Sequence, residues 1–275
     1  MTATAAAASK ERSTGLLSLL TLGAMPSKAV RGGLQVASLL VPLLLWTAIA
    51  SLGLVDEKFL PSPQAVFRSL ASMAESGILF QDIVASTGRV FGGFLLATLL
   101  AVPIGICMGV YPAICAICEP LIAMLRYMPA AAFIPLLIIY LGIGEEPKIA
   151  LIFLGTIYFN ILMVMDAVKF VPKELIETTL TLGGRSRQVL VQVVARYSLP
   201  SIIDTLRINI ATSWNLVVVA ELVAAEVGLG KRIQLAQRFF RTDQIFAELI
   251  VLGLIGFAID MGFRLLLRLS CKWAV

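Results

Sequence analysis

Long apolar segments alternate with short polar connections along most of the chain. A spanning helix needs about 20 mainly apolar residues, and six segments approach or exceed that length with few charges. They cover about residues 34–54, 86–110, 114–141, 149–165, 198–222 and 245–267. The pattern therefore predicts an all-α integral membrane protein with about six transmembrane helices.

The amino-terminal region breaks this pattern. Residues 1–33 contain an apolar piece at 15–22 that is too short to span and is flanked by basic residues, which predicts a cytoplasmic tail with an interfacial segment. A secretory signal peptide is the alternative, but no convincing small-residue cleavage site follows. Residues 34–275 are expected to form the membrane domain, with a short amphipathic surface helix at about 63–73.

The most informative polar stretch is about 169–200, between the fourth and fifth apolar segments. Pro172 suits the first turn of a helix, with Glu174 and Glu177 near its positive end. Gly183 suits a left-handed stop, and a second helix can begin at Ser186. The stretch predicts a structured loop of two helices joined at glycine.

Basic residues orient the chain, because cytoplasmic connections carry an excess of Lys and Arg. Both termini and the 169–200 stretch are predicted to be cytoplasmic. The connection at 223–243 violates the rule with Lys231, Arg232, Arg238 and Arg241. We expect this basic excess to attract an anion or an acidic docking surface.

Composition excludes several classes. Hydrophobic residues make up 59% of the 275-residue chain and charged ones 14%, so this is no soluble domain, and no separate ATPase domain would fit. The chain has no histidine, which rules out a His-based triad and most zinc sites, so no catalytic or metal residues are predicted. The net charge of +5 is spread over the loops, which does not indicate nucleic-acid binding. Cys115 and Cys118 lie in an apolar run and are predicted to be packing residues.

Polar or aromatic side chains inside the apolar segments are candidates for a solute pathway. They are Arg126, Tyr158, Asn160, Trp214, Asn215 and Glu221. Tyr158, Trp214 and Asn215 also fit core or interface positions, and Glu221 fits a gate, a docking contact or a packing role.

Arg126 leaves two interpretations open. It lies in a proline-broken segment, where its guanidinium can face a cavity and help an anion across. Alternatively, it pairs with Glu119 or Asp166 and only holds helices together. Asp204 and Arg207, three residues apart, are expected to form a structural pair on one helix face.

The 169–200 stretch resembles the cytoplasmic coupling loop of ABC importer permeases. Glu177 and Gly183 stand at the spacing of that family, and Leu199-Pro200 matches its later Leu-Pro. Thr178 and Thr179 replace two alanines, and Ala195-Arg196 stands where the first Leu-Pro is usual.

Motifs over about residues 55–270 resemble the permeases of the nitrate, sulfonate, taurine and bicarbonate group. They include Leu60-Pro-Ser-Pro63, Ser86 with Arg89-Val90, Arg126-Tyr-Met-Pro129, Gly142-Ile-Gly144, Val217 to Glu221 and Gly228-Leu-Gly230.

The resemblance implies a homodimeric permease of an ATP-driven importer in the bacterial plasma (inner) membrane. Its cargo would be a small anion (nitrate, bicarbonate, taurine or another sulfonate) delivered by an extracytoplasmic solute-binding protein. Cytoplasmic ABC ATPase subunits would bind the ATP and Mg, so this chain would hold no cofactor and would not itself be an enzyme. The residues implied in ATPase coupling are Glu174, Glu177, Gly183, Gly184, Arg185, Ser186 and Arg187.

A secondary transporter or channel acting without an ATPase is the alternative. It would need a complete site in one chain, with inverted repeats or coupled carboxylates along a proton path. Neither is clear in the sequence.

Overall fold

A computed structural model describes residues 27–273, and every regular element in that part is helical. The chain divides into two compact units, residues 1–63 and 64–275. In the first unit, α1 (Lys28–Ser51) begins after Ser27, whose side chain accepts a hydrogen bond from the Val30 N–H. The Trp46 indole N–H donates to the Pro61 carbonyl at 3.0 Å, which folds the following connection back on the helix.

The first apolar helix therefore begins six residues earlier than the predicted position 34. It includes two basic residues, Lys28 and Arg31, that were expected in the tail. A membrane-spanning helix can continue beyond its apolar stretch, because Lys and Arg side chains at its end extend to the polar membrane interface. The predicted interfacial segment at 15–22 lies outside the described residues.

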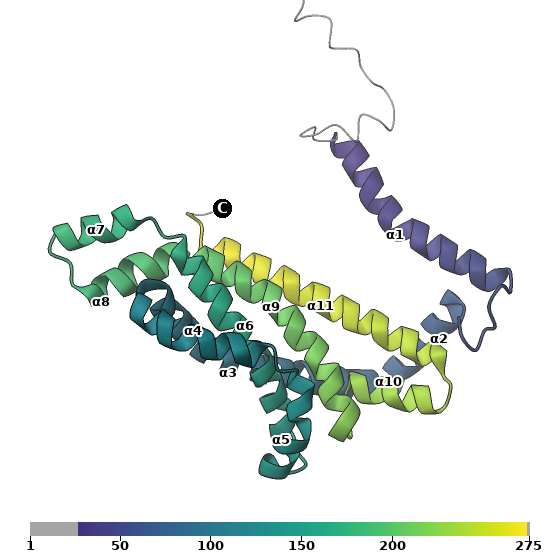
Figure 1. The fold of residues 1–275 in the computed structure, drawn as a ribbon. Coiled ribbons are helices and arrows are strands. Elements are labelled where there is room, and N and C mark those ends of the chain that lie inside the picture. The colour runs from purple at the N-terminus through teal and green to yellow at the C-terminus, as the bar shows by residue number, and fades with distance from the viewer. Residues whose placement is uncertain (1–26, 274–275) are drawn as a thin grey trace, which may run out of the picture. The chain divides into compact units, whose positions relative to one another are not determined.

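The remaining helices follow in chain order (Figure 1). They are α2 (Pro63–Glu75), α3 (Ile78–Val110), α4 (Pro112–Arg126), η2 (Ala130–Phe133), α5 (Ile134–Leu141), α6 (Glu146–Lys169), α7 (Lys173–Thr181), α8 (Ser186–Gln188), η3 (Val189–Val194), α9 (Ala195–Ala224), α10 (Leu229–Arg238) and α11 (Thr242–Ser270). In the described part, five helical segments are long and apolar enough to cross a membrane, or six if the bent pair of α4 and the 130–141 segment is one span. The predicted fold class is confirmed.

The predicted third span, 114–141, is a broken helix, as its prolines indicated. It breaks after Arg126, and the helices on either side are bent by 84°. Pro129 explains the break, because proline has no N–H to donate and pushes the preceding residue away from helical geometry. The 130–141 segment is thus a separate arm of the fold.

Helices α3, α6 and α9 form the core of the second unit. Glycines on α3 let α6 approach closely: a Cβ added at Gly105 would lie 2.8 Å from the Ile161 carbonyl oxygen. Buried polar pairs join α6 to α9, with the Thr156 and Ser213 hydroxyls 2.8 Å apart. These contacts fix the three helices side by side.

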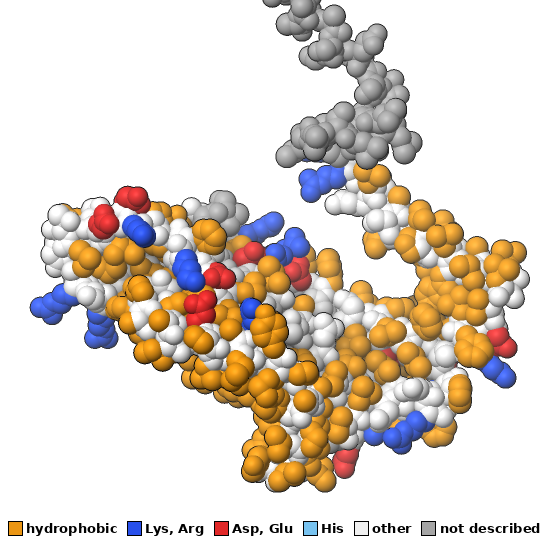
Figure 2. Space-filling model, in the orientation of Figure 1, with side chains coloured by type: hydrophobic (Ala, Val, Ile, Leu, Met, Phe, Trp, Pro, Cys, Tyr) orange, Lys and Arg blue, Asp and Glu red, His pale blue; other side chains and the backbone are white. Residues whose placement is uncertain are grey.

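Apolar side chains cover much of the visible surface, and charged ones gather near α7 (Figure 2). Large exposed apolar residues lie along α3 and α11, among them Leu95, Leu99, Leu254 and Phe257. An exposed apolar band of this kind fits contact with lipid. Within the second unit, α7 and α8 lie at one end and α5 and α10 at the other (Figure 1).

Candidate functional site

The first candidate site is the α7–α8 hairpin, residues 173–188, whose geometry agrees with the sequence prediction. Helix α7 begins after Pro172 and carries Glu174 in its first turn. Gly183 adopts a φ of +85°, the left-handed conformation expected of a helix stop. The Gly184 N–H donates to the Thr179 carbonyl at 2.9 Å, and α8 begins at Ser186.

Most of the coupling candidates are exposed to solvent. Exposed members are Glu174, Glu177, Gly183, Arg185, Ser186 and Arg187, while Gly184 is half-buried. Side chains of both signs thus face outward, which suits a docking surface for another protein.

An apolar cluster attaches this hairpin to the helix bundle. Val168 near the end of α6 and Val171 just after it pack with Val189 and Val194 from η3, and Ile176 of α7 packs against them. Residues 189–194 form a π-helical segment that runs directly into α9. A shift of the hairpin would therefore pass into α6 and α9 through packed side chains.

The second candidate site lies at the opposite end of the second unit. Glu221, near the end of α9, is fully buried. Its carboxylate accepts hydrogen bonds from the Ser86 hydroxyl at 2.6 Å, from Arg89 Nη1 at 2.6 Å and from the Gly230 N–H at 2.8 Å. A buried carboxylate is stable only when it is paired and hydrogen-bonded in this way.

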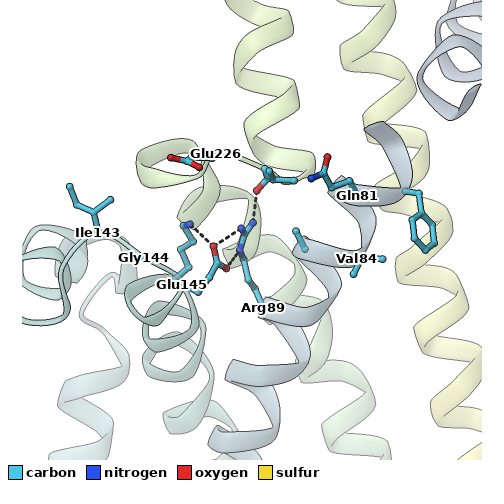
Figure 3. A pocket seen from close by; sticks show the side chains of 11 residues that line it. Gln81, Val84, Arg89, Ile143, Gly144, Glu145 and Glu226 are labelled. Carbon is cyan, nitrogen blue, oxygen red and sulfur yellow. Dashed lines mark hydrogen bonds and ion pairs between the residues drawn. The ribbon is translucent and has the colours of Figure 1, made fainter. Parts of the chain in front are cut away.

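Besides Glu221, Arg89 contacts two further segments, those of Glu145 and Val227 (Figure 3). Its Nε and Nη2 donate to the two carboxylate oxygens of Glu145, and its Nη1 also donates to the Val227 carbonyl at 2.7 Å. The Lys148 ammonium lies 2.8 Å from Glu145 Oε1. The hydrogen bond from Arg89 has the largest effect on the pKa of Glu145, and the hydrogen bond from Lys148 adds to it. Together they lower this pKa from 4.5 to about 2.

Asp82, on α3, forms hydrogen bonds with the turn before α10. This buried carboxylate accepts from the Gly228 N–H and from Arg232 Nε, each at 2.8 Å. Gly228 has a φ of +139°, and a Cβ there would lie 2.6 Å from Glu221 Oε2, so only glycine fits. We call Asp82, Ser86, Arg89, Glu145, Lys148, Glu221 and Arg232 the polar network.

The depressed pKa of Glu145 carries a pH prediction. A carboxyl whose folded pKa lies below its unfolded value contributes stability above about pH 4.5, and this contribution is lost as the pH falls toward 2. We expect Glu145→Gln to lower the thermal midpoint in detergent at neutral pH, with the gap to wild type closing below pH 4.5. The exposed Glu75, at the end of α2, is the control, and Glu75→Gln should open no gap. A gap that stays constant down to pH 2 would contradict the assignment.

The pathway candidates lie in different surroundings. Glu221 belongs to the polar network. Asn160 is buried and accepts from Asn209 Nδ2 at 2.7 Å, while the Trp214 indole N–H donates to the Leu252 carbonyl at 3.0 Å. Tyr158 is half-buried against an apolar cluster, and Asn215 is exposed.

Neither predicted partner of Arg126 pairs with it. Its guanidinium lies 4.9 Å from the centre of the Tyr127 ring, and its Nη2 donates to the Tyr127 hydroxyl at 3.1 Å. Glu119 instead accepts from the Cys115 thiol, and Asp166 pairs with Lys169 at 3.6 Å. The side chain of Arg126 is exposed, so the structural pairing interpretation is wrong and the anion role stays a prediction.

The other local predictions have clear outcomes. Asp204 and Arg207 pair at 2.9 Å, as predicted, and Arg207 also reaches Asp260 on α11 at 3.1 Å. Cys115 and Cys118 are free thiols that pack against an apolar cluster.

Sequence reasoning missed most of the polar network. Asp82, Glu145 and Lys148 were not singled out, and Arg89 appeared only as a motif residue. Except for the pair of Glu145 and Lys148, which are three residues apart, their partners lie 56 to 150 residues away in the chain, so local spacing does not reveal them. The available signal was the presence of ionisable residues at the ends of apolar segments, which are costly unless paired.

Spanning helices with an exposed hairpin at one end and a buried ionic network at the other define a polytopic membrane component. The family of binding-protein-dependent transport system inner membrane components matches residues 98–270. The chain belongs to this family: it is an ABC importer permease of type I and a multi-pass inner membrane protein.

Three individual relatives align with most of the chain. The chain is 36% identical over 245 residues to the taurine transport system permease protein TauC of Escherichia coli K12, covering 87% of this chain and 89% of the relative. It is 32% identical to the putative aliphatic sulfonates transport permease protein SsuC of Bacillus subtilis 168, covering 85% and 84%. The riboflavin transport system permease protein RibX of Chloroflexus aurantiacus is also 32% identical, over 88% and 90%.

The fold matches a solved transporter. A chain of the MetNI methionine ABC transporter in an inward-facing conformation superposes with a TM-score of 0.62 at 19% identity, covering 70% of this chain and 95% of that one. The predicted resemblance to importer permeases is confirmed.

Proposed function

We propose that this permease imports small sulfonates, taurine or a related compound, driven by ATP hydrolysis in a partner subunit. Two kinds of relatives support the substrate class: the taurine permease TauC and the sulfonate permeases named SsuC. Nitrate and bicarbonate, also implied by the group resemblance, have no such support among these relatives.

One structural observation carries the proposed mechanism. The α7–α8 hairpin exposes residues of both signs, yet the apolar cluster of Val168, Val171, Val189 and Val194 fixes it to the helix bundle. A rigid, polar, outward-facing hairpin of this kind suits the transmission of movement from a soluble ATPase to the helices α6 and α9.

The remaining partners follow from this assignment. Two copies of the chain form the pore, each with an ABC ATPase subunit on its hairpin, and ATP and Mg bind only to the ATPase. The hairpin side is cytoplasmic, which places both termini in the cytoplasm and the polar network on the outer side. A solute-binding protein delivers the substrate there.

The test is reconstitution of the permease with its ATPase and solute-binding protein in proteoliposomes. We expect taurine or ethanesulfonate to enter only when ATP is present, and nitrate and bicarbonate not to compete. Uptake by the permease alone, without ATP, would instead establish the secondary transporter. Competition by nitrate would contradict the sulfonate assignment while leaving the importer mechanism intact.

A further inference from the structure

A cavity of about 740 Å³ lies beside the polar network, inside the second unit. Its walls come from the start of α3, the turn before α6 and the segment that follows α9 (Figure 3). Phe80 and Ile143 line it and are largely exposed, at 72% and 83%. The cavity is large enough for a small solute.

The charged groups on the cavity wall balance to zero. Arg89 and Lys148 contribute two positive charges, and Glu145 and Glu226 contribute two negative ones. Glu145 is held by both cations, so it offers little to a ligand. A wall with separate charges of both signs suits a ligand that also carries both.

Two of these groups keep unused binding capacity. Lys148 is buried, with 5% exposure, and an ammonium has three N–H donors. Within the described residues its Nζ makes one hydrogen bond, to Glu145 Oε1. Glu226 is exposed, and its carboxylate makes no hydrogen bond or ion pair with any part of the chain that the structure describes.

We infer that this cavity is a substrate site at the mouth of the permease and that it takes a zwitterionic amino sulfonate. The sulfonate binds toward Lys148 and the ammonium toward Glu226, with the short alkyl chain beside the apolar rim. This inference rests on the proposed sulfonate import and names the kind of sulfonate.

The charge pattern discriminates between ligands. A simple anion such as ethanesulfonate could bind Lys148 but would leave Glu226 without a cation and close to a like charge. An amino sulfonate satisfies both groups, because its ammonium donates a charge-assisted hydrogen bond to the Glu226 carboxylate while its sulfonate accepts one from Lys148. The site should therefore favour taurine over ethanesulfonate, and this difference is its specificity.

The experiment measures binding to the purified full-length permease in nanodiscs, without ATPase or solute-binding protein. Saturation-transfer NMR titrations would use taurine, ethanesulfonate and ethylamine as probes. We expect taurine to bind about fivefold more tightly than ethanesulfonate, the upper ratio that one solvent-exposed ion pair supports. Glu226→Gln should remove this preference and leave ethanesulfonate binding equal or stronger.

Two further variants complete the design. Lys148→Met should weaken the binding of both sulfonates, while Glu75→Gln, which changes an exposed carboxylate outside the cavity, should change neither. Because Glu226 is exposed and unpaired within the described chain, its substitution leaves the folded protein intact, which makes it the decisive variant.

Three results would overturn the inference. They are the absence of taurine binding at millimolar concentration, equal binding of taurine and ethanesulfonate to wild type, and an effect of Glu226→Gln on association with the solute-binding protein alone. The last would show that the cavity receives a protein segment. Since the titration needs no ATP, its failure beside intact ATP-driven sulfonate uptake would remove this site and leave the proposed function standing.

Discussion

Replacing Glu221 with alanine is expected to destabilise the permease by at least about 3 kcal/mol, the cost of removing one partner of a buried ion pair. The substitution would leave the Ser86 hydroxyl and the Gly230 N–H without an acceptor, and Arg89 with a missing counter-charge. Arg89 retains Glu145, which keeps the expected loss near the lower end of the range for such pairs. Unfolding in mixed detergent micelles, followed by circular dichroism, measures the change.

Glu248 provides the matched control for this prediction. It is another fully buried glutamate, on α11, but neither of its carboxylate oxygens has a hydrogen-bond partner within the described residues. A buried carboxyl without a partner costs free energy, so Glu248→Leu should leave stability unchanged or raise it. Equal destabilisation by Glu221→Ala and Glu248→Leu would mean that burial, rather than the polar network, decides the effect.

Loss of Glu221 should also affect transport through the turn that precedes α10. Gly228, Leu229 and Gly230 all donate their backbone N–H to side chains of the network. Without Glu221 this turn loses the hydrogen bond of Gly230 and keeps those to Asp82, Ser86 and Arg89, so uptake in proteoliposomes should fall together with stability. We therefore expect Glu221 to act through the polar network. From its position near the end of a predicted span alone, a gate, a docking contact and a packing role were all open.

The sequence predicted those parts of the fold that depend on local patterning. Apolar length defined the spans, Gly183 marked the stop of α7, and Ser186 marked the start of α8, because each depends on the preference of one residue or its near neighbours. The bend after Arg126 was signalled by Pro129, but its angle of 84° depends on how the arm packs against α6 and α9.

The polar network could not be predicted from the sequence in the same way. Ser86 meets Glu221 across 135 residues, and Asp82 meets Arg232 across 150. Such pairs form because four helices and two turns converge, and the spacing within a single sequence holds no information about that convergence. At Asn160 the sequence does give a local signal, because a polar residue in a span suggests a pathway. In the structure this side chain is buried between Thr98 and Asn209.

The largest functional effect is expected at the joint between α7 and α8. Gly183→Val should uncouple transport from ATP hydrolysis, because Gly183 has a φ of +85° and a β-branched residue is strongly disfavoured there. Nothing lies within 4 Å of an added Cβ, so the effect arises from the backbone alone. Residues 184–187 would turn to a different direction, which would misplace Arg185 and Arg187 on the proposed docking surface.

Gly53 offers a control with the same backbone strain. It has a φ of +62° and open space around an added Cβ, but it lies in the first unit, outside the hairpin. Both Gly→Val variants should lose about 1–2 kcal/mol of stability, the cost of a left-handed conformation for an L-residue. Only Gly183→Val should reduce co-purification with the ATPase subunit and lower ATP-driven sulfonate uptake by about tenfold or more, which corresponds to 1.4 kcal/mol or more.

Glu177→Lys tests the same surface without disturbing the backbone. Glu177 is exposed on α7, so reversal of its charge leaves the apolar cluster beneath the hairpin intact. We expect the permease to remain folded while binding of the ATPase weakens, with the loss growing at low ionic strength, because like charges then repel at longer range. If Glu177→Lys and Gly183→Val both bind the ATPase as wild type does, the ATPase contacts another part of the permease. The α7–α8 hairpin would then be an ordinary solvated loop.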